Sequence, residues 1–360
     1  MDQRRRRITI SDIAEQAGVS IAGVSYALNG RRGVSDDTRQ RVLRVAAELG
    51  WSPTSAARSL AGADTETIGL VLARDPRLLG TESYFMQFVA GVETVLADRG
   101  YGLLLQVVTT NDDDVATMNK WRASRRVDGV LLVDLLEEDG RIELSTREGA
   151  LPAVVVADRS IAGPLASVWT DDASSMRDAV DYLAGLGHTG IVRVTGFEGF
   201  AYTSIRDAAF VEAMSSRGLT PAILRTDYTP DAGAQVTRQA LAGASPPSAL
   251  IFDNDVMAVA ALGIAAEMGL RVPDDLSVIA WDDSPLCEYV YPKLTAVGHD
   301  VMALGAHAAS RLLEVIAGAP PASHQDATPR LRVRASTGPA PIRRAIGTAD
   351  REPYTNGPRA

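Results

Sequence analysis

The spacing of apolar residues divides the chain into two kinds of sequence. Up to about residue 50, apolar side chains recur at steps of three and four, which is the period of short amphipathic helices. From Thr67 onward, short apolar runs such as residues 67–73 alternate with helical patterns that end at glycine. This alternation predicts parallel sheets covered by helices. We therefore expect a small helical head followed by a larger α/β body.

Polar residues in the first part of the chain mark the start of three short helices. Thr9 lies three residues before Asp12, a capping-box spacing, and Gly18 is suited to end the helix that follows. Ser20 can cap a second helix and Ser35 a third. Their buried faces would consist of Ile13, Ala14, Ala17, Val24, Ala27, Leu28, Val42, Val45, Ala46 and Leu49. Two short helices joined by a tight glycine turn form the helix-turn-helix pattern.

The charge distribution adds to this interpretation. Residues 1–60 contain ten arginines and six acidic residues, whereas the rest of the chain contains 26 basic and 39 acidic residues. A basic head on an acidic body suits contact with phosphates at one end of the molecule. The run Arg4–Arg7 is equally compatible with a solvated, disordered start of the chain. The head is thus a candidate DNA-binding domain.

The α/β pattern occurs twice in succession. Candidate strands cover residues 67–73, 102–107, 127–133 and 154–156, and then 191–195, 222–224, 249–252 and 277–281. Two consecutive units suggest two lobes, each with a doubly wound parallel sheet. The tail from Ala340, which contains Pro, Gly and Arg, is expected to be disordered.

Polar residues follow several candidate strands, at the edge where open α/β sheets bind ligands. Asp158 follows one strand, Arg206 opens a helix after another, and two later strands precede the runs Asp253–Asp255 and Asp282–Asp283. Carboxylates, the amide of Asn254 and an arginine suit a hydroxyl-rich or carboxylated small molecule.

The alternative is that each of these residues caps the helix that follows it. We favour capping for Asp171, Asp255 and Asp283. We favour ligand contact for Asp158, Arg206, Asn254 and Asp282.

Patterns that would indicate an enzyme are missing or misplaced. Residues 185–190 spell a dinucleotide-binding fingerprint, but a helix precedes it and a strand follows it, the reverse of the required order. The four histidines show no metal-ligand spacing, and the chain has no nucleophile elbow or phosphate-binding loop. The run Asp112–Asp114 is most simply a solvated loop. We expect no enzymatic activity, no metal and no cofactor.

The composition also favours a cytoplasmic location. Cys287 is the single cysteine, which excludes an internal disulfide. The first arginines are followed by polar helical sequence, so no export signal is expected. The chain has no run of eighteen apolar residues that could span a membrane.

Many residues of the head match a known family at fixed spacing. They are Thr9-Ile10-Ser11-Asp12-Ile13-Ala14, Ala17-Gly18-Val19-Ser20, Val24-Ser25, Leu28-Asn29, Val34-Ser35, Thr38-Arg39 and Ala57-Arg58-Ser59-Leu60. In these residues the chain resembles the lac repressor (LacI/GalR) family, and the resemblance extends to about Pro339. It implies a sequence-specific DNA-binding transcriptional regulator, most simply a repressor, that binds a two-fold symmetric operator as a homodimer. A small-molecule effector, expected to be a sugar or sugar derivative, would control it from between two core lobes.

The resemblance implies the domain organisation as well. The core would have a periplasmic-binding-protein-like fold, whose chain crosses between the lobes three times. We expect a helix-turn-helix head at residues 1–53, a hinge helix and linker at 54–66, a first lobe at 67–164 plus 293–322, a second lobe at 165–292 plus 323–339, and a tail at 340–360.

The resemblance implies two sets of contact residues. For DNA they are Thr9, Ser20, Ile21, Ala22, Ser25, Tyr26, Asn29, Arg58 and Leu60. Ile21, Ala22 and Tyr26 occupy base-reading positions, and Leu60 would be a wedge in the minor groove. For the effector they are Tyr84, Phe85, Asp158, Arg206, Tyr228, Asn254 and Asp282. Tyr228 could stack on a sugar ring, while Phe85 is equally compatible with the core.

Three residues depart from the usual pattern of the family. Gly23 stands in the recognition helix where threonine is common, at a cost of about 1 kcal/mol of helix stability relative to alanine. Thr54 replaces a common asparagine at the start of the hinge but can still cap. Ala209 replaces a common glycine near Arg206, which weakens the assignment of that arginine.

Two other classes of protein compete with this interpretation. A solute-binding receptor would have the same two lobes without a DNA function, but the missing export signal and the intact head argue against it. An enzyme with a fused head would need a nucleophile and base or a metal cluster, and neither is found in the sequence.

Overall fold

The computed structural model describes residues 8–28, 32–51, 64–80 and 83–342. Predictions for Arg4–Arg7, Asn29, Thr54, the hinge with Arg58 and Leu60, and the tail beyond residue 342 lie outside the described residues.

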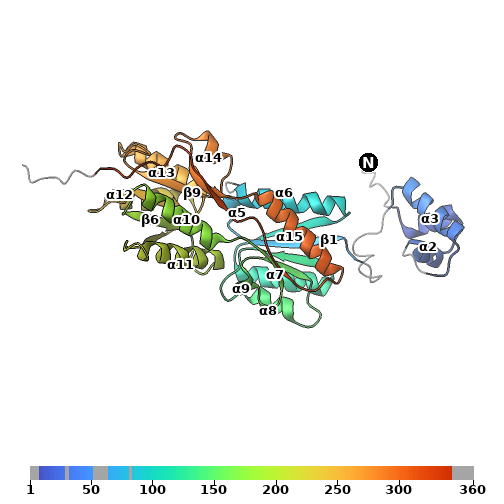
Figure 1. Cartoon of the computed structure of the whole chain (residues 1–360). Coiled ribbons are helices and arrows are strands. Elements are labelled where there is room, and N and C mark those ends of the chain that lie inside the picture. Colours follow the sequence, from blue (N-terminus) through green and yellow to red (C-terminus); the bar gives the residue numbers. More distant parts are fainter. Residues whose placement is uncertain (1–7, 29–31, 52–63, 81–82, 343–360) are drawn as a thin grey trace, which may run out of the picture. The chain divides into compact units, whose positions relative to one another are not determined.

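Three helices form the head: α1 (Ile10–Ala17), α2 (Ile21–Leu28) and α3 (Asp36–Glu48) (Figure 1). The predicted start of each helix is confirmed. The Thr9 N–H and hydroxyl donate to the Asp12 carboxylate at 2.8 and 2.7 Å. Ser20 Oγ accepts from the N–H of Gly23 at 3.1 Å, and Ser35 Oγ accepts from the N–H of Thr38 at 3.3 Å. These bonds satisfy N–H groups that lack partners within the helix.

The three helices enclose a small core of their own. It contains Ile13, Ala14, Ala17, Val24, Ala27, Val42, Val45 and Ala46. Gly18 adopts a φ of 63°, the left-handed conformation that allows the tight turn between α1 and α2. The helix-turn-helix prediction is therefore confirmed.

The first lobe consists of Phe85–Trp169 and Val301–Asp326 together with the segment that contains β1. Its sheet has the order β11-β5-β4-β3-β1-β2, and each of these pairings is parallel. The strands are β1 (Thr67–Ala73), β2 (Gly102–Val108), β3 (Gly129–Leu132), β4 (Ala153–Val156), β5 (Ala166–Trp169) and β11 (Ser323–Gln325).

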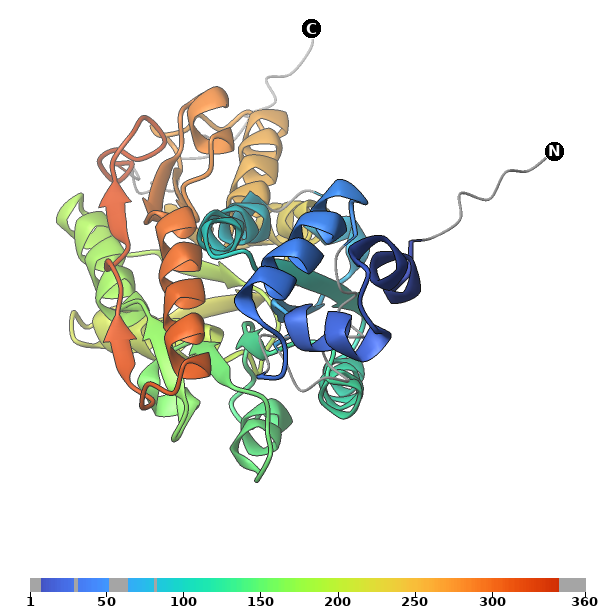
Figure 2. The same cartoon turned by 90° about the vertical axis from the view of Figure 1, so that its right-hand side faces the viewer.

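Helices cover both faces of the first sheet. They are α5 (Pro76–Leu79), α6 (Ser83–Asp98), α7 (Asn111–Ser124), α8 (Gly140–Thr146), α9 (Arg159–Ala162) and α15 (Val301–Ile316). α6 and α15 run side by side along one face, while α7, α8 and α9 lie against the other (Figures 1 and 2). Burial on both faces explains why the inner strands β1, β3 and β4 are apolar runs rather than alternating patterns.

The second lobe contains Thr170–Asp300 and the segment that follows Ala327. Its sheet has the order β12-β10-β9-β8-β6-β7, in which only β12 is antiparallel among the described strands. The strands are β6 (Ile191–Thr195), β7 (Ala222–Arg225), β8 (Ala249–Phe252), β9 (Ser277–Trp281), β10 (Thr295–Gly298) and β12 (Arg330–Arg332). The helices are α10 (Asp172–Gly185), α11 (Ala201–Ser215), α12 (Pro230–Leu241), α13 (Asp255–Glu267) and α14 (Leu286–Tyr289).

The two sheets share one strand order, which reverses between β1 and β3 in the first and between β6 and β8 in the second. This is the doubly wound arrangement, with its ligand-binding edge at the carboxyl ends of the strands. The predicted fold class, a helix-turn-helix head on two doubly wound lobes, is confirmed.

The chain passes between the lobes a few residues later than the sequence predicts. β5 pairs with β4 in the first lobe although residue 165 was the expected start of the second. β10 pairs with β9 in the second lobe, whereas the first was expected to resume at residue 293. β11 pairs with β5 in the first lobe, beyond its expected end at residue 322. Short strands such as these fit either sheet by pattern, so only their pairing decides.

Two local predictions also need correction. Residues 112–114 are not a solvated loop but the first turn of α7, and Asp114 is buried. Helix α11 begins at Ala201, so Arg206 lies within its second turn rather than at its start. In both cases the helix extends into polar sequence that carries no apolar period.

Candidate functional sites

Helix α2 leaves one face uncovered by the head. Ile21 is 56% exposed and Tyr26 is 41% exposed, while Val24 and Ala27 on the opposite face are buried. Ala22 is exposed and Ser25 is half-buried. Because residues 21, 22, 25 and 26 are one turn apart, they form a single face, which we call the α2 face. Large apolar side chains left in water at this density indicate a contact surface.

The ring of Tyr26 lies against a glycine of the following loop. Gly33 has a φ of 130°, and a Cβ built there would lie 3.1 Å from Cδ2 of Tyr26. The glycine therefore allows the loop to approach the ring closely. The sequence pattern did not single out Gly33.

Gly23 within α2, unlike Gly33, has room for a side chain. A Cβ at Gly23 would meet Ser20 Oγ at 3.4 Å and Val19 Cβ at 3.6 Å, which are ordinary contacts. The fold of the head thus does not require glycine at this position.

In the second lobe, Arg206 on α11 lies among acidic and aromatic side chains. Its Nε donates to Asp172 Oδ2 at 2.7 Å, one Nη lies 2.6 Å from the same oxygen, and the other lies 3.5 Å from Asp253. The guanidinium carbon is 4.0 Å from the centroid of the Trp281 ring. This contact is a cation–π interaction, and it fixes the plane of the guanidinium group.

A second arginine, which the sequence pattern did not single out, donates two hydrogen bonds to Asp253. Arg193 lies in β6 with no exposed surface, and its two Nη atoms donate to Asp253 at 2.6 and 2.9 Å. Its Nε donates to Asp207 at 2.7 Å, and Thr195 Oγ1 donates to Asp253 at 2.5 Å. The signal in the sequence is an arginine in the middle of the otherwise largely apolar strand Ile191–Thr195.

The ion pairs keep these groups charged despite their burial. Burial by itself would raise the pKa of Asp253, but Arg193 and Arg206 hold it below its usual value. Burial would likewise lower the pKa of Arg206, but Asp172, Asp253 and Asp282 raise it. A buried pair that loses one partner leaves an uncompensated charge, so these residues depend on one another.

Tyr228 is buried rather than presented to a ligand. Only 3% of the residue is exposed, and its hydroxyl lies 3.1 Å from Thr203 Oγ1. A Cβ at Gly196 would lie 1.8 Å from the Tyr228 ring, so glycine is needed there. Burial, followed by the charge of Asp253, raises the pKa of Tyr228 to about 12. A ring so enclosed offers little surface for the predicted stacking on a sugar.

Asn254 and Asp158, predicted to be ligand contacts, serve as helix caps. Asn254 Oδ1 accepts from the N–H of Met257 at 2.9 Å, and its Nδ2 donates to the carbonyl of Tyr228 at 3.0 Å. Asp158 Oδ1 accepts from the N–H and the hydroxyl of Ser160 at 2.9 and 2.7 Å. The residue between a strand and the next helix is also the N-cap of that helix, which is why the two roles coincide in sequence.

The three predicted caps have mixed outcomes. Asp171 caps α10 through the N–H of Ser174 at 2.9 Å, as predicted. Asp255 is instead the first residue of α13 and hydrogen-bonds Ser284. Asp283 is not a cap either, because Arg332 and Arg334 bind it at 3.0 and 2.7 Å.

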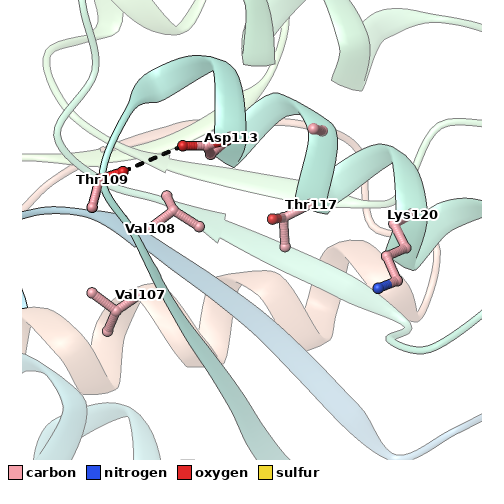
Figure 3. A pocket seen from close by; sticks show the side chains of 7 residues that line it. Val107, Val108, Thr109, Asp113, Thr117 and Lys120 are labelled. Carbon is pink, nitrogen blue, oxygen red and sulfur yellow. Dashed lines mark hydrogen bonds between the residues drawn. The ribbon is translucent and has the colours of Figure 1, made fainter.

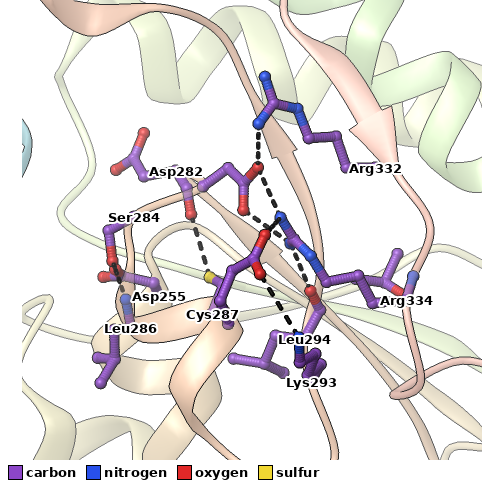
Figure 4. A network of polar contacts seen from close by, with 12 residues as sticks. Asp255, Asp282, Ser284, Leu286, Cys287, Lys293, Leu294, Arg332 and Arg334 are labelled. Atoms are coloured by element: carbon purple, nitrogen blue, oxygen red, sulfur yellow. Dashed lines mark hydrogen bonds and ion pairs between the residues drawn. The ribbon is translucent and has the colours of Figure 1, made fainter.

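Asp282 differs from the adjacent Asp283 in conformation and surroundings. It has a φ of 63°, and its carbonyl accepts a hydrogen bond from Cys287 Sγ at 3.6 Å. Its carboxylate points away from the cluster that Asp283 forms with Arg332 and Arg334 (Figure 4). Burial, followed by the nearby charge of Asp255, raises the pKa of the Cys287 thiol to about 12, so this cysteine stays protonated and unreactive.

Tyr84 and Phe85, both predicted to contact the effector, lie in the first turn of α6 and differ in burial. Phe85 is 2% exposed and lies under Arg74, whose guanidinium carbon is 5.2 Å from the ring centroid. Tyr84 is half-buried. Of the two readings left open for Phe85, the structure thus favours the core.

The first lobe has a buried ion cluster of its own. Arg141 donates to Asp114 at 2.6 Å, to Asp139 at 2.6 Å and to the carbonyl of Asp134 at 2.9 Å. Burial raises the pKa of Asp114 to about 6, although Arg141 opposes the shift. The cluster ties α7 to α8.

An open pocket of about 420 Å³ lies between β2 and α7 (Figure 3). It is lined by Val107, Val108, Thr109, Asp113, Ala116, Thr117 and Lys120. None of the predicted effector residues lines it, and its polar groups do not converge on one point. We therefore do not regard it as the effector site.

Two other kinds of site, a membrane-spanning helix and a metal-binding cluster of side chains, are absent among the residues that the structure describes. No helix in this part of the chain is long and apolar enough to cross a membrane. Nor do the described residues contain a group of three or more His, Cys, Asp or Glu side chains arranged to hold a metal ion.

Comparison with protein families gives two matches. The pattern of bacterial regulatory proteins of the lacI family matches residues 9–54, and that of the periplasmic binding protein-like domain matches residues 180–337.

Individual relatives match over most of their length. The probable HTH-type transcriptional repressor ExuR of Bacillus subtilis is 31% identical, over 86% of this chain and 92% of its own. The HTH-type transcriptional repressor PurR of Erwinia tasmaniensis is 33% identical, over 86% of this chain and 90% of its own.

Two solved structures are similar over 92% of this chain and 100% of theirs. The lac repressor dimer bound to operator and the anti-inducer ONPF has 27% identity and a TM-score of 0.80. The complex of the transcriptional regulator CelR with cellobiose has 28% identity and a TM-score of 0.69.

Proposed function

The chain belongs to the lacI family of bacterial regulatory proteins, and from this premise we propose that it is a homodimeric repressor released from its operator by a sugar-like effector. DNA binding and transcriptional regulation are the activities of the family. The dimer, the effector and the residues that serve each function are our proposal. The head matched at residues 9–54 argues against a solute-binding receptor, and relatives named as repressors argue against an enzyme. A regulator of this kind acts where the DNA is, so we place it in the bacterial cytoplasm.

The observation that carries the DNA-binding part is the α2 face. Ile21, Ala22 and Tyr26 are exposed on the second helix of a helix-turn-helix, the element that enters the major groove. Ile21 and Ala22 can contact thymine methyl groups, while Tyr26 can also hydrogen-bond. We assign phosphate contacts to Thr9, Ser20 and Ser25, because hydroxyls commonly contact the backbone. By resemblance alone, Asn29, Arg58 and Leu60 complete the set.

The effector site is proposed at the carboxyl ends of the strands of the second lobe. Arg206 and Asp282 remain the residues we assign to ligand contact, together with Tyr84 by resemblance. Asp158, Asn254, Tyr228 and Phe85 would act indirectly, because each is engaged in a cap or in the core. A sugar is the ligand class that suits this set, and cellobiose is the ligand named for one structural neighbour.

Control by the effector requires two states of the protein. A ligand shifts their balance only by its differential affinity for the two. We propose that the sugar binds the state whose heads are not positioned for the operator. Two heads related by two-fold symmetry would read a symmetric operator, so the proposal includes a dimer, the form named for the lac repressor neighbour.

The effector residues are tested by Arg206→Ala and Asp282→Ala in the full-length protein. Each change removes a charge-assisted bond worth roughly 1.5–3 kcal/mol, so release from the operator should need about ten to a hundred times more sugar. The operator is first selected from genomic fragments, and release is then measured by fluorescence anisotropy against a panel of sugars.

The matched control is Arg271→Ala, which removes an exposed arginine whose pair with Asp275 lies on the protein surface. It should behave as wild type. If both test variants respond at the wild-type sugar concentration, the assignment of the site is wrong. If wild type selects no DNA, the repressor proposal itself fails.

A further inference from the structure

A continuous chain of ion pairs connects the interior of the second lobe to Arg206. Arg193 binds Asp253 through two N–H groups, and Asp253 lies 3.5 Å from Arg206. Arg206 in turn is bound to Asp172 at 2.6 Å. The side chains of Arg193 and Asp253 have no exposed surface, and those of Arg206 and Asp172 are 12% and 11% exposed.

Negative charge exceeds positive charge around Arg206. Three guanidinium groups face four carboxylates: those of Arg193, Arg206 and Arg225 face those of Asp172, Asp207, Asp253 and Asp282. Arg225 pairs with Asp207 at 2.5 Å, and the negative charge of Asp282 raises the pKa of Arg206. Arg206 is therefore neutralised by groups of the protein itself. A cation already matched in this way is a poor receptor for a ligand anion.

The geometry leads to the same conclusion. Asp172 Oδ2 binds both Nε and one Nη of Arg206, so the side-on pair of donors that a ligand carboxylate could use is occupied, and the other Nη lies 3.5 Å from Asp253. Trp281 fixes the guanidinium plane, so the group cannot turn away from Asp172 without losing the ring contact. A ligand carboxylate or phosphate would have to displace Asp172 and approach Asp253 as a like charge. A hydroxyl group meets neither obstacle, because it can both donate to a carboxylate and accept from an N–H.

We propose that Asp172 and Asp253, the latter held in place by Arg193, are specificity-determining residues that make the effector an uncharged polyhydroxylated molecule and exclude sugar acids and sugar phosphates. The inference rests on the proposed effector site and narrows its ligand, since the residue types alone fit a carboxylated molecule as well. Arg193 acts as a positioning residue, because it touches Asp253 and Asp207 and reaches Arg206 only through Asp253.

The experiment measures thermal stability of the full-length protein with matched probes. Glucose, cellobiose and galactose are compared with glucuronate, galacturonate and glucose 6-phosphate, each at an ionic strength balanced with sodium chloride. A ligand that binds the folded state raises Tm by mass action. The proteins are wild type, Asp172→Asn, Arg206→Ala and the control Asp275→Asn, in which an exposed aspartate paired with Arg271 is changed in the same way.

The proposal predicts that the acids and the phosphate leave the Tm of wild type and of Asp275→Asn unchanged. Asp172→Asn frees Arg206, so at least one acid should stabilise this variant, with an apparent affinity at least about tenfold above wild type. Circular dichroism establishes that the variant is folded.

Two results would overturn the proposal. One is stabilisation of wild type by a sugar acid or phosphate that Arg206→Ala abolishes, because Arg206 would then already receive anions. The other is a folded Asp172→Asn protein that no acid stabilises. Neither result depends on DNA binding, so failure here is distinct from failure of the repressor proposal, which would appear as wild type that selects no operator.

Discussion

Neighbouring residues of one type have different roles in this protein, and their surroundings decide which. Asp282 and Asp283 both follow β9, but Asp283 is bound by Arg332 and Arg334, while Asp282 adopts a φ of 63° and turns its carboxylate elsewhere. Asn254, which also follows a strand in sequence, caps α13 through its Oδ1 and donates through its Nδ2 to the carbonyl of Tyr228. A position directly after a strand thus identifies a polar residue as a candidate for ligand contact, but the groups that its side chain contacts determine its role.

At the residue scale, Tyr26→Arg tests whether Tyr26 reads a base. Arginine can form two hydrogen bonds with guanine, so preference for guanine should increase at one symmetric pair of operator positions by roughly 1–3 kcal/mol. Selection of bound random DNA with wild type and variant measures the change. If Tyr26 only lies along a phosphate, the variant will bind all sequences more tightly and select the wild-type motif.

At the scale of elements, glycines set how closely helices approach one another. A Cβ at Gly91 of α6 would lie 1.9 Å from the carbonyl oxygen of Met302, and one at Gly305 of α15 would lie 2.2 Å from that of Phe88. The backbones of α6 and α15 are therefore in direct contact, and two glycines far apart in sequence make this possible. Gly263 of α13, by contrast, has no neighbour within 4 Å of such a Cβ.

This contrast gives a prediction about stability. Gly305→Ala should destabilise the protein by roughly 1–3 kcal/mol, because the added methyl group meets backbone that cannot move aside. Gly263→Ala is the control and should stabilise it by up to about 1 kcal/mol, since glycine is unfavourable within a helix. Urea denaturation of both variants measures the free energy of unfolding. Equal effects of the two changes would contradict the close helix contact.

At the scale of the whole molecule, charge is divided between the head and the rest of the chain. Residues 1–60 carry ten arginines against six acidic residues, while the chain as a whole has a net charge of −9. The net charge of the head thus favours contact with DNA phosphates, while the net negative charge of the remainder opposes unspecific contact elsewhere.

The division of charge predicts a strong salt dependence of operator binding. Each phosphate that the head neutralises releases counterions, so log K should fall linearly with log[salt], with a slope of about −0.9 per phosphate contact. Fluorescence anisotropy between about 50 and 200 mM salt measures the slope. A flat plot would show that the positive charge of the head does not contribute to binding.

The sequence by itself determined the three helices of the head, the inner strands of both lobes, the fold class and the family. Capping residues such as Thr9 and Ser35 act within one turn of a helix, and buried strands show as apolar runs, so both are local properties of the chain. Arg206 was proposed for the effector site from its position after a strand and from the family resemblance, and that assignment stays a prediction. Only the tertiary structure decided that Arg193 and Asp253 pair inside the second lobe, that β10 belongs to one sheet and β11 to the other, and that Tyr228 is buried against Gly196. These contacts join residues far apart along the chain, and pairing across such distances depends on which strands and helices become neighbours in space.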